Sequence, residues 1–475
     1  MIEFEHVSFA YEGLEEGKLC DLSFTIKKGE CILLTGQSGC GKTTVTRLIN
    51  GLIPEFFPGA LQGEVRIDGK LIFEEPIYEI AARVGSVFQN PKTQFFHMDT
   101  DGEIAFGMEN NGLQQAKMRQ RVNEAARELG IEKLLGRSIF SLSGGEKQKI
   151  AFASVYAMNP DIYLLDEPSS NLDEAAIHDL EKQIALLKKQ GKTIIIAEHR
   201  LYYLKELADR IFHLEKGRLT RILEREEFLQ ISGEERERMG LRSLERQRNI
   251  AFLHCGGTQD ENLVQDGREE RKALLELQNL SVGYGKKVIL SGLNFKASQG
   301  EMIAVTGHNG VGKSTFSRTL CGLLKPLSGQ IIWKGTVRKE KERLQHSYMV
   351  MQDVNYQLFA DSVEHECSFG IKNPDYGAVA RTMQELGLYT YRNRHPNTLS
   401  GGEKQRVAVA VSMICRKDIL IFDEPTSGLD YESMQSVVRL MKQLSAMGKI
   451  IFVVTHDFEF IAQACTRVWE LEGQI

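Results

Sequence analysis

The 475-residue sequence lacks any apolar run near the ~20 residues that a helix needs to cross a bilayer. Its longest apolar stretches lie in IYLLDEP, TIIIAEH, ILIFDEP and IIFVVTH, span four to seven residues, and are typical of buried parallel strands. The opening residues, MIEFEHVSFAYEG, predict a strand and lack the basic and apolar regions of a signal peptide. We therefore expect a protein that meets a membrane only through a partner.

Paired cysteines and an excess of positive charge are also missing. The eight cysteines are scattered without a C-x-x-C pair, which argues against a disulfide framework and against zinc or iron–sulfur sites. We expect reduced, mostly buried thiols. The formal net charge of −5 provides no bulk positive field for nucleic acid. The length, with 42% hydrophobic and 26% charged residues, is that of a globular protein of two or three domains.

A phosphate-loop motif is present twice. GQSGCGKTT and GHNGVGKST both fit G-x-x-x-x-G-K-[ST], and each follows an apolar run, CILLT or EMIAVT. Glycines in such a loop let successive backbone N–H groups point at a triphosphate, and the N-terminus of the following helix adds positive potential. Lys42 and Lys313 can reach the β- and γ-phosphates, and the hydroxyls of Thr43 and Ser314 can ligate Mg²⁺.

Further motifs recur in the same order in both halves of the chain. The two lysines lie 271 positions apart, and the glutamines of VFQNP and VMQDV lie 263 apart. The LSGGEKQ segments, the glutamates of LLDEP and IFDEP, and the histidines of AEHR and VTHD all lie 257 apart. Because nothing is inserted or deleted between LSGGEKQ and the histidine, we expect function to use the relative geometry of that block.

The repeat divides the chain into a first copy, residues 1–220, a linker, residues 221–273, and a second copy, residues 274–475. Short apolar strands alternate with helical stretches in each copy, which predicts an α/β fold with a mainly parallel sheet. Polar helical segments between the glutamine and LSGGEKQ predict a helical subdomain. The linker starts with opposite charges at helical spacing and continues as polar, Gly-containing sequence, so we interpret it as a solvated tether.

In combination these motifs resemble the ATP-binding-cassette (ABC) ATPases over nearly the whole chain outside the linker. Each copy has a phosphate loop, a glutamine loop, the LSGGEKQ signature, an acidic strand end, a D-loop (residues 169–173 and 426–430) and a switch histidine. The resemblance implies two P-loop NTPase cassettes, each with a mainly parallel core sheet, an antiparallel β subdomain and a helical signature subdomain. It also implies hydrolysis of ATP, with ATP and Mg²⁺ as cofactors.

The resemblance implies a role for each motif. A carboxylate at the end of an apolar strand can hold the hydration shell of Mg²⁺, and the glutamate after it can polarise the attacking water. The expected catalytic residues are Glu167, His199, Glu424 and His456. The expected metal-binding residues are Thr43, Gln89, Asp166, Ser314, Gln352 and Asp423. The expected ATP-binding residues are Tyr11, Gly36, Gln37, Ser38, Gly39, Cys40, Gly41, Lys42, Thr43, Thr44, Gln89, Ser143, Gly144, Gly145, Tyr284, Gly307, His308, Asn309, Gly310, Val311, Gly312, Lys313, Ser314, Thr315, Gln352, Ser400, Gly401 and Gly402.

Further expectations concern the surroundings of the nucleotide and the number of active sites. Tyr11 and Tyr284 match the position where the family stacks an aromatic ring on adenine, and a plain strand aromatic is the alternative. The family sandwiches ATP between two cassettes, so the signature of each copy would close the site of the other. Both sets are complete, which predicts two hydrolysing sites. Cys40 either has no role or offers an accessible thiolate near Lys42 that alkylating agents would modify.

Residues 87–112, VFQNPKTQFFHMDTDGEIAFGMENNG, are similar to the glutamine loop and following segment of the energy-coupling-factor (ECF) importer ATPases. The matching residues are Gln89, Pro91, Gln94, Glu103, Ala105, Phe106, Gly107, Glu109 and Asn110. The second copy keeps Gln357 and Phe369-Gly370 but lacks the Asn-Pro pair. Residues 50–69 resemble members of this group that fuse both ATPases in one chain.

This resemblance implies an ATPase motor at the cytoplasmic face of the cell membrane that drives uptake of a vitamin or a metal micronutrient. The implied partners are a membrane-embedded coupling (T) subunit, which would contact residues 89–110 and 352–370, and a small substrate-capture (S) subunit; no nucleic acid is expected. An ordinary amphipathic surface is the alternative for those segments. The alternative functions are the ATPase of another ABC importer and a soluble twin-cassette ATPase acting on ribosomes, for which a basic helical arm or cysteine clusters would be expected.

Overall fold

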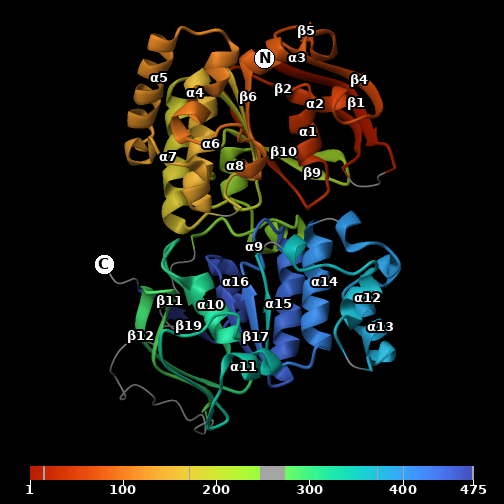
Figure 1. Ribbon diagram of the computed structural model, residues 1–475. Helices are drawn as coiled ribbons and strands as arrows, with labels where there is room; N and C mark the ends of the chain where they lie inside the picture. Colours follow the sequence, from red (N-terminus) through yellow and green to blue (C-terminus); the bar gives the residue numbers. More distant parts are fainter. Residues whose placement is uncertain are drawn as a thin grey trace. The chain divides into compact units, whose positions relative to one another are not determined.

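The computed structural model describes residues 1–13, 17–170, 172–246, 273–352, 354–371, 373–399 and 401–472. These residues form two compact units, the first containing Met1–Arg246 and the second containing most of the described residues from Ala273 onward. Each unit has a mainly parallel core sheet, an antiparallel sheet and a group of helices (Figure 1), which confirms the predicted fold class. No helix in the described ranges is long and apolar enough to span a membrane.

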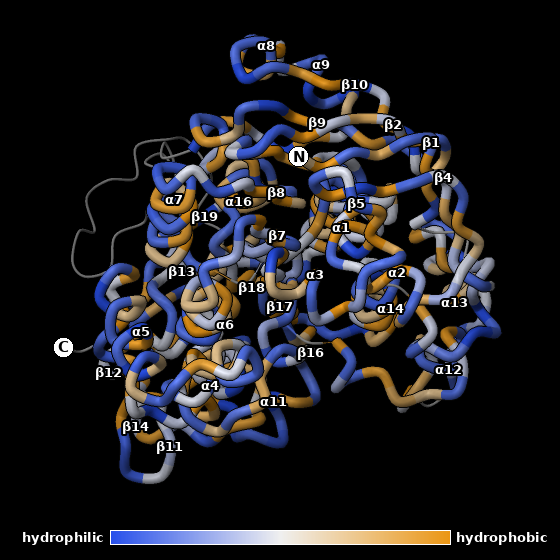
Figure 2. The backbone as a smooth tube through the Cα atoms, turned by 90° about the horizontal axis from the view of Figure 1, so that it is seen from above, coloured by the Kyte–Doolittle hydropathy of each residue, from blue (hydrophilic) through white to orange (hydrophobic). Residues whose placement is uncertain are grey.

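The core sheet of the first unit has six strands in the order β10-β9-β3-β8-β7-β6. Its strands are β3 (Cys31–Thr35), β6 (Val84–Val87), β7 (Ile162–Asp166), β8 (Thr193–Ala197), β9 (Arg210–Glu215) and β10 (Arg218–Glu224). All neighbours are parallel except β9 and β10. All five residues of β8 are buried, as expected for a parallel strand covered on both faces, and Figure 2 shows hydrophobic colour at this strand.

The antiparallel sheet and the helices flank this core sheet. The antiparallel strands, in the order β2-β1-β4-β5, are β1 (Ile2–Tyr11), β2 (Leu19–Ile26), β4 (Gly59–Ile67) and β5 (Lys70–Leu71). The helices are α1 (Lys42–Ile49), α2 (Leu52–Glu55), α3 (Ile77–Arg83), α4 (Thr100–Asn110), α5 (Gln115–Glu128), α6 (Gly144–Met158), α7 (Glu174–Lys189), α8 (Arg225–Leu229) and α9 (Gly233–Arg238). Helices α4 and α5 pack on α6, on the opposite side of the unit from the antiparallel strands (Figure 1).

The second unit repeats this arrangement with a smaller sheet. Its core strands, in the order β16-β17-β18-β13-β19, are all parallel: β13 (Met302–Thr306), β16 (Ser347–Val350), β17 (Ile419–Asp423), β18 (Ile450–Val454) and β19 (Arg467–Glu470). The antiparallel strands are β11 (Ala273–Tyr284), β12 (Lys287–Ser298), β14 (Ser328–Trp333) and β15 (Thr336–Val337). The helices are α10 (Lys313–Cys321), α11 (Glu340–His346), α12 (Val363–Ser368), α13 (Tyr376–Glu385), α14 (Gly401–Ile414), α15 (Tyr431–Ala446) and α16 (Phe458–Ala464).

Residues 221–246, which the sequence assigns to the linker, fold onto the first unit. Strand β10 pairs with β9, and helices α8 and α9 follow it. Phe228 is 0% and Leu241 is 3% exposed in the core of this unit. Arg246 donates two hydrogen bonds to Glu174 Oε2, at 2.8 and 2.6 Å. The solvated tether therefore does not begin at residue 221, because apolar side chains inside the charged pattern are buried; the expected linker residues 247–272 lie outside the described residues.

Candidate active sites

The first phosphate loop connects β3 to α1 and curls around its lysine. Gly41 has a φ of 107°, and a Cβ there would lie 2.5 Å from Leu19 Cδ2, so glycine is required. The Nζ of Lys42 donates to the carbonyl oxygens of Gly36 at 2.9 Å and Gln37 at 3.1 Å. The start of α1 therefore places backbone N–H groups beside a positive charge, a combination that favours anions.

A histidine and a glutamate meet this lysine. His199 Nε2 lies 3.3 Å from Lys42 Nζ and 3.4 Å from Glu167 Oε1. Burial alone would raise the pKa of Glu167, but the hydrogen bond from His199 and the charges of His199 and Lys42 outweigh it and hold the pKa below its usual value. Gln89 Nε2 donates to Glu167 Oε2 at 2.6 Å. The glutamate is therefore ionised at neutral pH and surrounded by polar groups that orient it.

Glu167 also has an unusual backbone conformation, which its counterpart Glu424 shares. Their φ angles are 45° and 50°, in the left-handed region that few non-glycine residues adopt. The N–H of each glutamate donates at 2.8 Å to the carbonyl oxygen of the last residue of the neighbouring strand, Ala197 in β8 or Val454 in β18. Such a conformation costs on the order of 1–3 kcal/mol and is found where a side chain must be aimed.

A hydroxyl and a carboxylate form the other wall of the site. Thr43 Oγ1 donates to Asp166 Oδ1 at 3.3 Å, at the end of β7. Burial raises the pKa of Asp166 to about 6, and the charge of Glu167 adds to the rise. A buried carboxylate with a raised pKa is a group that a cation would stabilise.

The second unit builds the same arrangement from the matching residues. Lys313 Nζ lies 2.9 Å from His456 Nε2, which lies 3.8 Å from Glu424 Oε1. Ser314 Oγ donates to Asp423 Oδ2 at 3.1 Å, and burial raises the pKa of Asp423. The equivalent groups of the two predicted sites are thus brought together within each unit. Gln352 is exposed and lies two residues after the end of β16.

The signature motif starts α6, on the helical side of the first unit. Ser143 caps the helix: its Oγ accepts the N–H of Glu146 at 3.3 Å, and the Glu146 carboxylate accepts the N–H of Ser143 at 2.8 Å. A Cβ on Gly144, Gly401 or Gly402 would meet no heavy atom of the described residues within 4 Å. Neither the fold of the units nor backbone strain requires glycine there. Ser400 lies outside the described residues.

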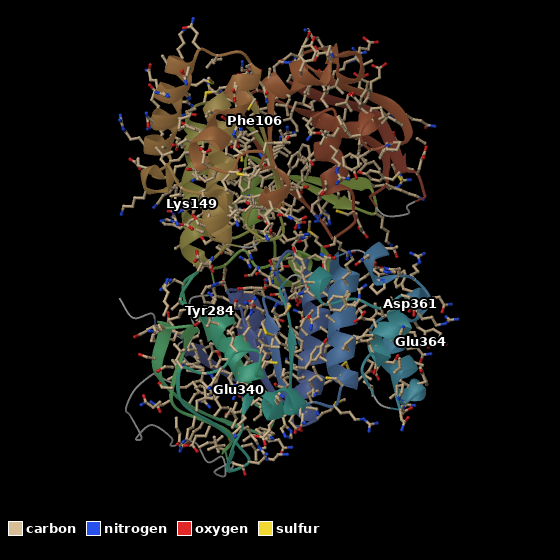
Figure 3. All side chains as sticks on the ribbon, in the orientation of Figure 1. Phe106, Lys149, Tyr284, Glu340, Asp361 and Glu364 are labelled. Carbon is tan, nitrogen blue, oxygen red and sulfur yellow. The ribbon has the colours of Figure 1, made fainter. Side chains whose placement is uncertain are left out.

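The two tyrosines expected at adenine differ in their surroundings. Tyr11 is partly buried, and its hydroxyl lies 3.2 Å from Thr44 Oγ1 and accepts a hydrogen bond from Arg47 at 3.1 Å. Its ring also packs edge-on against Phe9. Tyr284, at the end of β11 (Figure 3), is 46% exposed. The tyrosine of the first unit is held by the protein, whereas that of the second presents its ring to solvent.

Cys40 is not the accessible thiolate that the sequence allowed. It is 4% exposed and packs in the apolar core under the phosphate loop, and burial raises its pKa. Its counterpart Val311 is buried in the same way. A buried thiol with a raised pKa is unreactive, so Cys40 acts as a small apolar side chain.

The sequence comparison named a second glutamine in each half, Gln94 and Gln357, and Glu103 in the first half, without assigning them a structural role; the structure provides one. Gln94 accepts the N–H of Phe88 at 3.2 Å and donates to the carbonyl oxygen of Ser86 at 3.1 Å, which closes the glutamine loop. Gln357 closes the second loop in the same way. Glu103, 2% exposed, accepts the N–H groups of two residues in the turn that precedes its helix, and Glu366 does the same.

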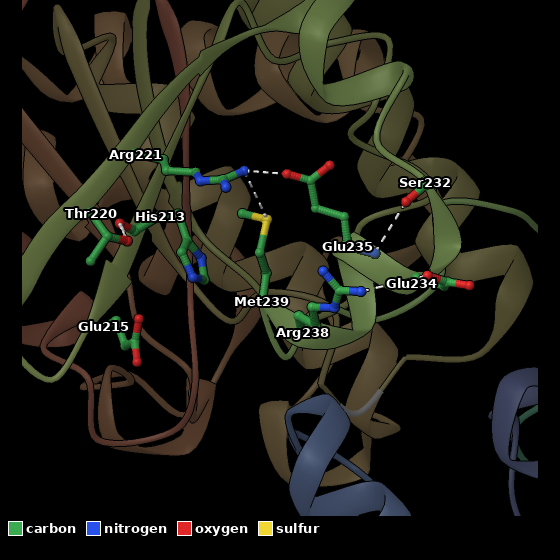
Figure 4. A pocket seen from close by; sticks show the side chains of 9 residues that line it. All are labelled: His213, Glu215, Thr220, Arg221, Ser232, Glu234, Glu235, Arg238 and Met239. Carbon is green, nitrogen blue, oxygen red and sulfur yellow. Dashed lines mark hydrogen bonds and ion pairs between the residues drawn. The ribbon is translucent and has the colours of Figure 1, made fainter.

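A separate hollow of about 520 Å³ lies in the first unit between the β9–β10 hairpin and α9 (Figure 4). Its arginines already have partners: Arg221 lies 2.5 Å from Glu235, and Arg238 lies 3.6 Å from Glu234. His213 is buried in its wall, and burial lowers its pKa. With its cations paired and a third carboxylate, Glu215, in its lining, the hollow does not suit a second phosphate group.

Comparison with known proteins agrees with this geometry. A family model described as ABC transporter matches residues 19–170 and 290–427. A Treponema denticola protein named as an ABC transporter ATP-binding protein is 48% identical over 476 residues, 100% of this chain and 96% of its own. A Methanosarcina mazei protein of the same description is 34% identical over 513 residues, 98% of this chain and 87% of its own. The solved structure of an RNase-L inhibitor superposes with a TM-score of 0.66 at 25% identity, covering 99% of this chain and 88% of its own. The chain therefore belongs to the ABC transporter family and is an ATPase that carries the ATP-binding cassette twice.

Proposed function

We propose that this protein is the ATP-hydrolysing motor of an ECF-type importer, attached to the cytoplasmic face of the cell membrane through its partners. The observation that carries the proposal is that both units bring a lysine, a histidine and a glutamate together in one arrangement. The lysine–histidine distances are 3.3 and 2.9 Å, and the histidine–glutamate distances are 3.4 and 3.8 Å. Because neither set has lost a group, we infer two hydrolysing sites.

Each catalytic group has a task that its surroundings support. Glu167 and Glu424 accept a proton from the attacking water, and the low pKa of Glu167 keeps it ionised at neutral pH. Lys42 and Lys313 hold the β- and γ-phosphates. His199 and His456, each between a cation and the carboxylate, stabilise charge on the γ-phosphate as it develops.

The fold family implies Mg²⁺, and the donor set suits it. The oxygens of Thr43 and Asp166 lie 3.3 Å apart, and the hard cation Mg²⁺ prefers such oxygen ligands. One hydroxyl and one carboxylate leave the remaining positions to water, phosphate oxygens and Gln89. When bound, the ion neutralises charge on the phosphates. Ser314, Asp423 and Gln352 form the matching set.

We further propose that the signature of each cassette closes the nucleotide site of the other. The first site would be closed by Ser400, Gly401 and Gly402, and the second by Ser143, Gly144 and Gly145. The open space around three of these glycines supports this reading, because a residue that the fold does not require to be glycine is explained by the close approach of a ligand. The Ser143 hydroxyl uses an acceptor site for its helix cap, so its proton can still be donated to a phosphate oxygen.

Each cassette also has an exposed aromatic patch after its glutamine loop, and we propose that these patches bind the coupling subunit. The first patch consists of the exposed Phe96 and Met98, at 73% and 74%, and of Phe106 on α4 (Figure 3), which is partly buried and stacks on the Phe96 ring. The second patch consists of Tyr356, Phe359 and Phe369, exposed by 71%, 72% and 56%. Several exposed apolar side chains within one short segment indicate an interaction surface.

Glu103 and Glu366 support this assignment, because each fixes the turn that carries its patch. Glu103 accepts the N–H groups of Phe96 and His97, both at 2.9 Å. Glu366 accepts those of Phe359 and Ala360, both at 2.7 Å. A turn that is held by a buried carboxylate presents its aromatic ring in one orientation, as a docking site needs.

The relatives favour transport over action on ribosomes. The Treponema denticola relative, at 48% identity, and the Methanosarcina mazei relative, at 34%, are both named for ABC transporters. The absence of paired cysteines in the sequence agrees with this choice. The vitamin or metal carried would contact the capture subunit and not this chain.

The test is isolation of the tagged protein from detergent-solubilised membranes of its own host, with identification of the co-purified subunits by mass spectrometry. We expect a large helical coupling subunit and a small membrane protein in stoichiometric amounts. Phe96→Ser with Phe359→Ser should abolish their recovery, and Phe140→Ser, at an exposed phenylalanine outside both patches, should not. Recovery with ribosomes and without membrane subunits would contradict the proposal.

A further inference from the structure

Glu198 is a buried acidic residue directly before the switch histidine, and no motif assigns it a role. It is 2% exposed, and its carboxylate accepts four hydrogen bonds. Oε1 accepts the N–H of His199 at 2.7 Å and that of Arg200 at 3.1 Å. Oε2 accepts the N–H of Ser169 at 3.2 Å and the hydroxyl of Tyr203 at 2.8 Å. Because a buried carboxylate is stable only with such donors, these bonds fix the position of every group that makes them.

These bonds join the two loops that carry the catalytic groups. Ser169 lies two residues after Glu167 and begins the D-loop, whereas His199 follows β8. Arg200 adds a second connection, because its NH1 donates to the carbonyl oxygen of Ser169 at 3.5 Å. The loop of the histidine and the loop after the glutamate are therefore tied together by one carboxylate.

The second unit ties the same loops from the other side of its histidine. The equivalent of Glu198 is Thr455, whose Oγ1 accepts the N–H of Asp457 at 3.1 Å. Asp457 Oδ2 accepts the hydroxyl of Thr426 at 2.7 Å. Thr426 lies 257 positions after Ser169 and is its equivalent. One buried carboxylate thus connects the loops in each unit, before the histidine in the first and after it in the second.

We propose that Glu198 is a positioning residue of the first ATP site and that Asp457 has the same task in the second. Glu198 holds His199 at its place beside Glu167, where the two side chains lie 3.4 Å apart. The inference rests on the proposed roles of these two residues in hydrolysis. A displaced imidazole stabilises the transition state less well, so losing the tie lowers kcat more than it weakens ATP binding by the phosphate loop.

The experiment uses the full chain with Glu424→Gln, so that turnover reports the first site. In this background Glu198→Thr imports the residue of the second unit and should lower kcat by about tenfold, with KM for ATP changed by less than about threefold. Glu198→Thr with Arg200→Asp moves the carboxylate to the far side of the histidine and should restore most of kcat. Glu206→Gln, at an exposed glutamate in the same segment, is the matched control and should leave kcat unchanged.

Two further variants make each outcome decisive. Glu198→Gln keeps the shape of the side chain and is the substitution that should disturb folding least. It should also lower kcat by about tenfold, because the amide offers only one acceptor oxygen. His199→Ala tests the histidine itself: retained turnover there would overturn the proposed function. Loss of turnover in His199→Ala with wild-type kcat in Glu198→Thr or Glu198→Gln would overturn only the positioning role. A folded double variant, judged by its melting temperature, that is no faster than Glu198→Thr would also overturn it.

Discussion

His199 Nε2 and Glu167 Oε1 lie 3.4 Å apart, although 32 positions separate the two residues in the chain. His456 and Glu424 repeat the relationship at 3.8 Å. In each unit the glutamate directly follows one parallel strand and the histidine follows the neighbouring strand, so the edge of the sheet brings them together. A group that accepts a proton and a group that can stabilise phosphate charge are thereby adjacent twice in one molecule.

This equivalence predicts equal effects of Glu167→Gln and Glu424→Gln. Each change removes the general base of one site, so steady-state ATPase turnover should fall by about twofold or more and to a similar level in both variants, with the remaining turnover coming from the intact site. Binding of ATP should persist in both variants. Measurement of turnover at saturating ATP checks this, and wild-type rates in one variant with complete loss in the other would show that a single site hydrolyses.

The buried Asp166 predicts a stability that depends on pH in the absence of nucleotide and metal. Its pKa is about 6 in the folded protein and 3.8 in the unfolded reference. Between these values the folded state binds more protons, so the free energy of unfolding falls as pH rises through this window and the loss is complete above pH 6.

Asp166→Asn removes this charge and should stabilise the ligand-free protein at pH 7.5 by on the order of 1–3 kcal/mol. The gain should be smaller at pH 5, where the folded carboxyl is largely protonated. Urea unfolding with a chelator present at the two pH values measures the difference. An equal gain at both values would show that the pKa of Asp166 is not raised.

The two adenine-site tyrosines should respond differently to mutation. Tyr284→Ala, at an exposed ring, should raise KM for ATP by about threefold or more at the second site, isolated by Glu167→Gln, with little change in melting temperature. Tyr11→Phe removes the hydrogen bonds to Thr44 and Arg47 and should destabilise the protein by about 1 kcal/mol. Melting curves and site-isolated kinetics together separate the two effects; a KM unchanged by Tyr284→Ala would favour a plain strand aromatic.

Neighbouring residues of α8 test whether this segment belongs to the first unit. Phe228 is 0% exposed and Leu229 is 40% exposed. Phe228→Ala should lower the free energy of unfolding by about 3–5 kcal/mol, whereas Leu229→Ala should change it by less than about 1 kcal/mol. Chemical unfolding of both variants makes the comparison, and equal small effects would place the segment in a solvated tether after all.

The fold class and the groups of each site could be predicted because the evidence was local. Apolar runs of strand length each bear a polar residue at their end, and contiguous motifs carry the lysine, glutamate and histidine. The importance of Glu198 could not be predicted in this way. Its four hydrogen-bond donors include Ser169, 29 positions away in the sequence. A glutamate at the same point of a surface loop would be a solvated charge without a structural role.

Two other readings of the sequence, an accessible thiolate as the alternative for Cys40 and a tether that begins at residue 221, disagree with the structure for related reasons. The direction of the Cys40 side chain depends on the path of the phosphate loop, which points this side chain into the apolar core. The neighbouring residues in the sequence do not indicate that direction. In residues 221–246 the many charges concealed the few apolar residues that decide the packing, Phe228 and Leu241 among them. A pattern dominated by charge describes the surface of a segment and says little about its one buried face.

The burial of Phe228 and Leu241 has a practical consequence for anyone who wishes to produce the first cassette by itself. A stop codon placed where the repeated motifs end, near residue 220, would remove both side chains from the core and leave an apolar cavity. Truncation after Arg246 keeps both buried side chains. It also keeps Arg246, whose hydrogen bonds to Glu174 join the segment to helix α7.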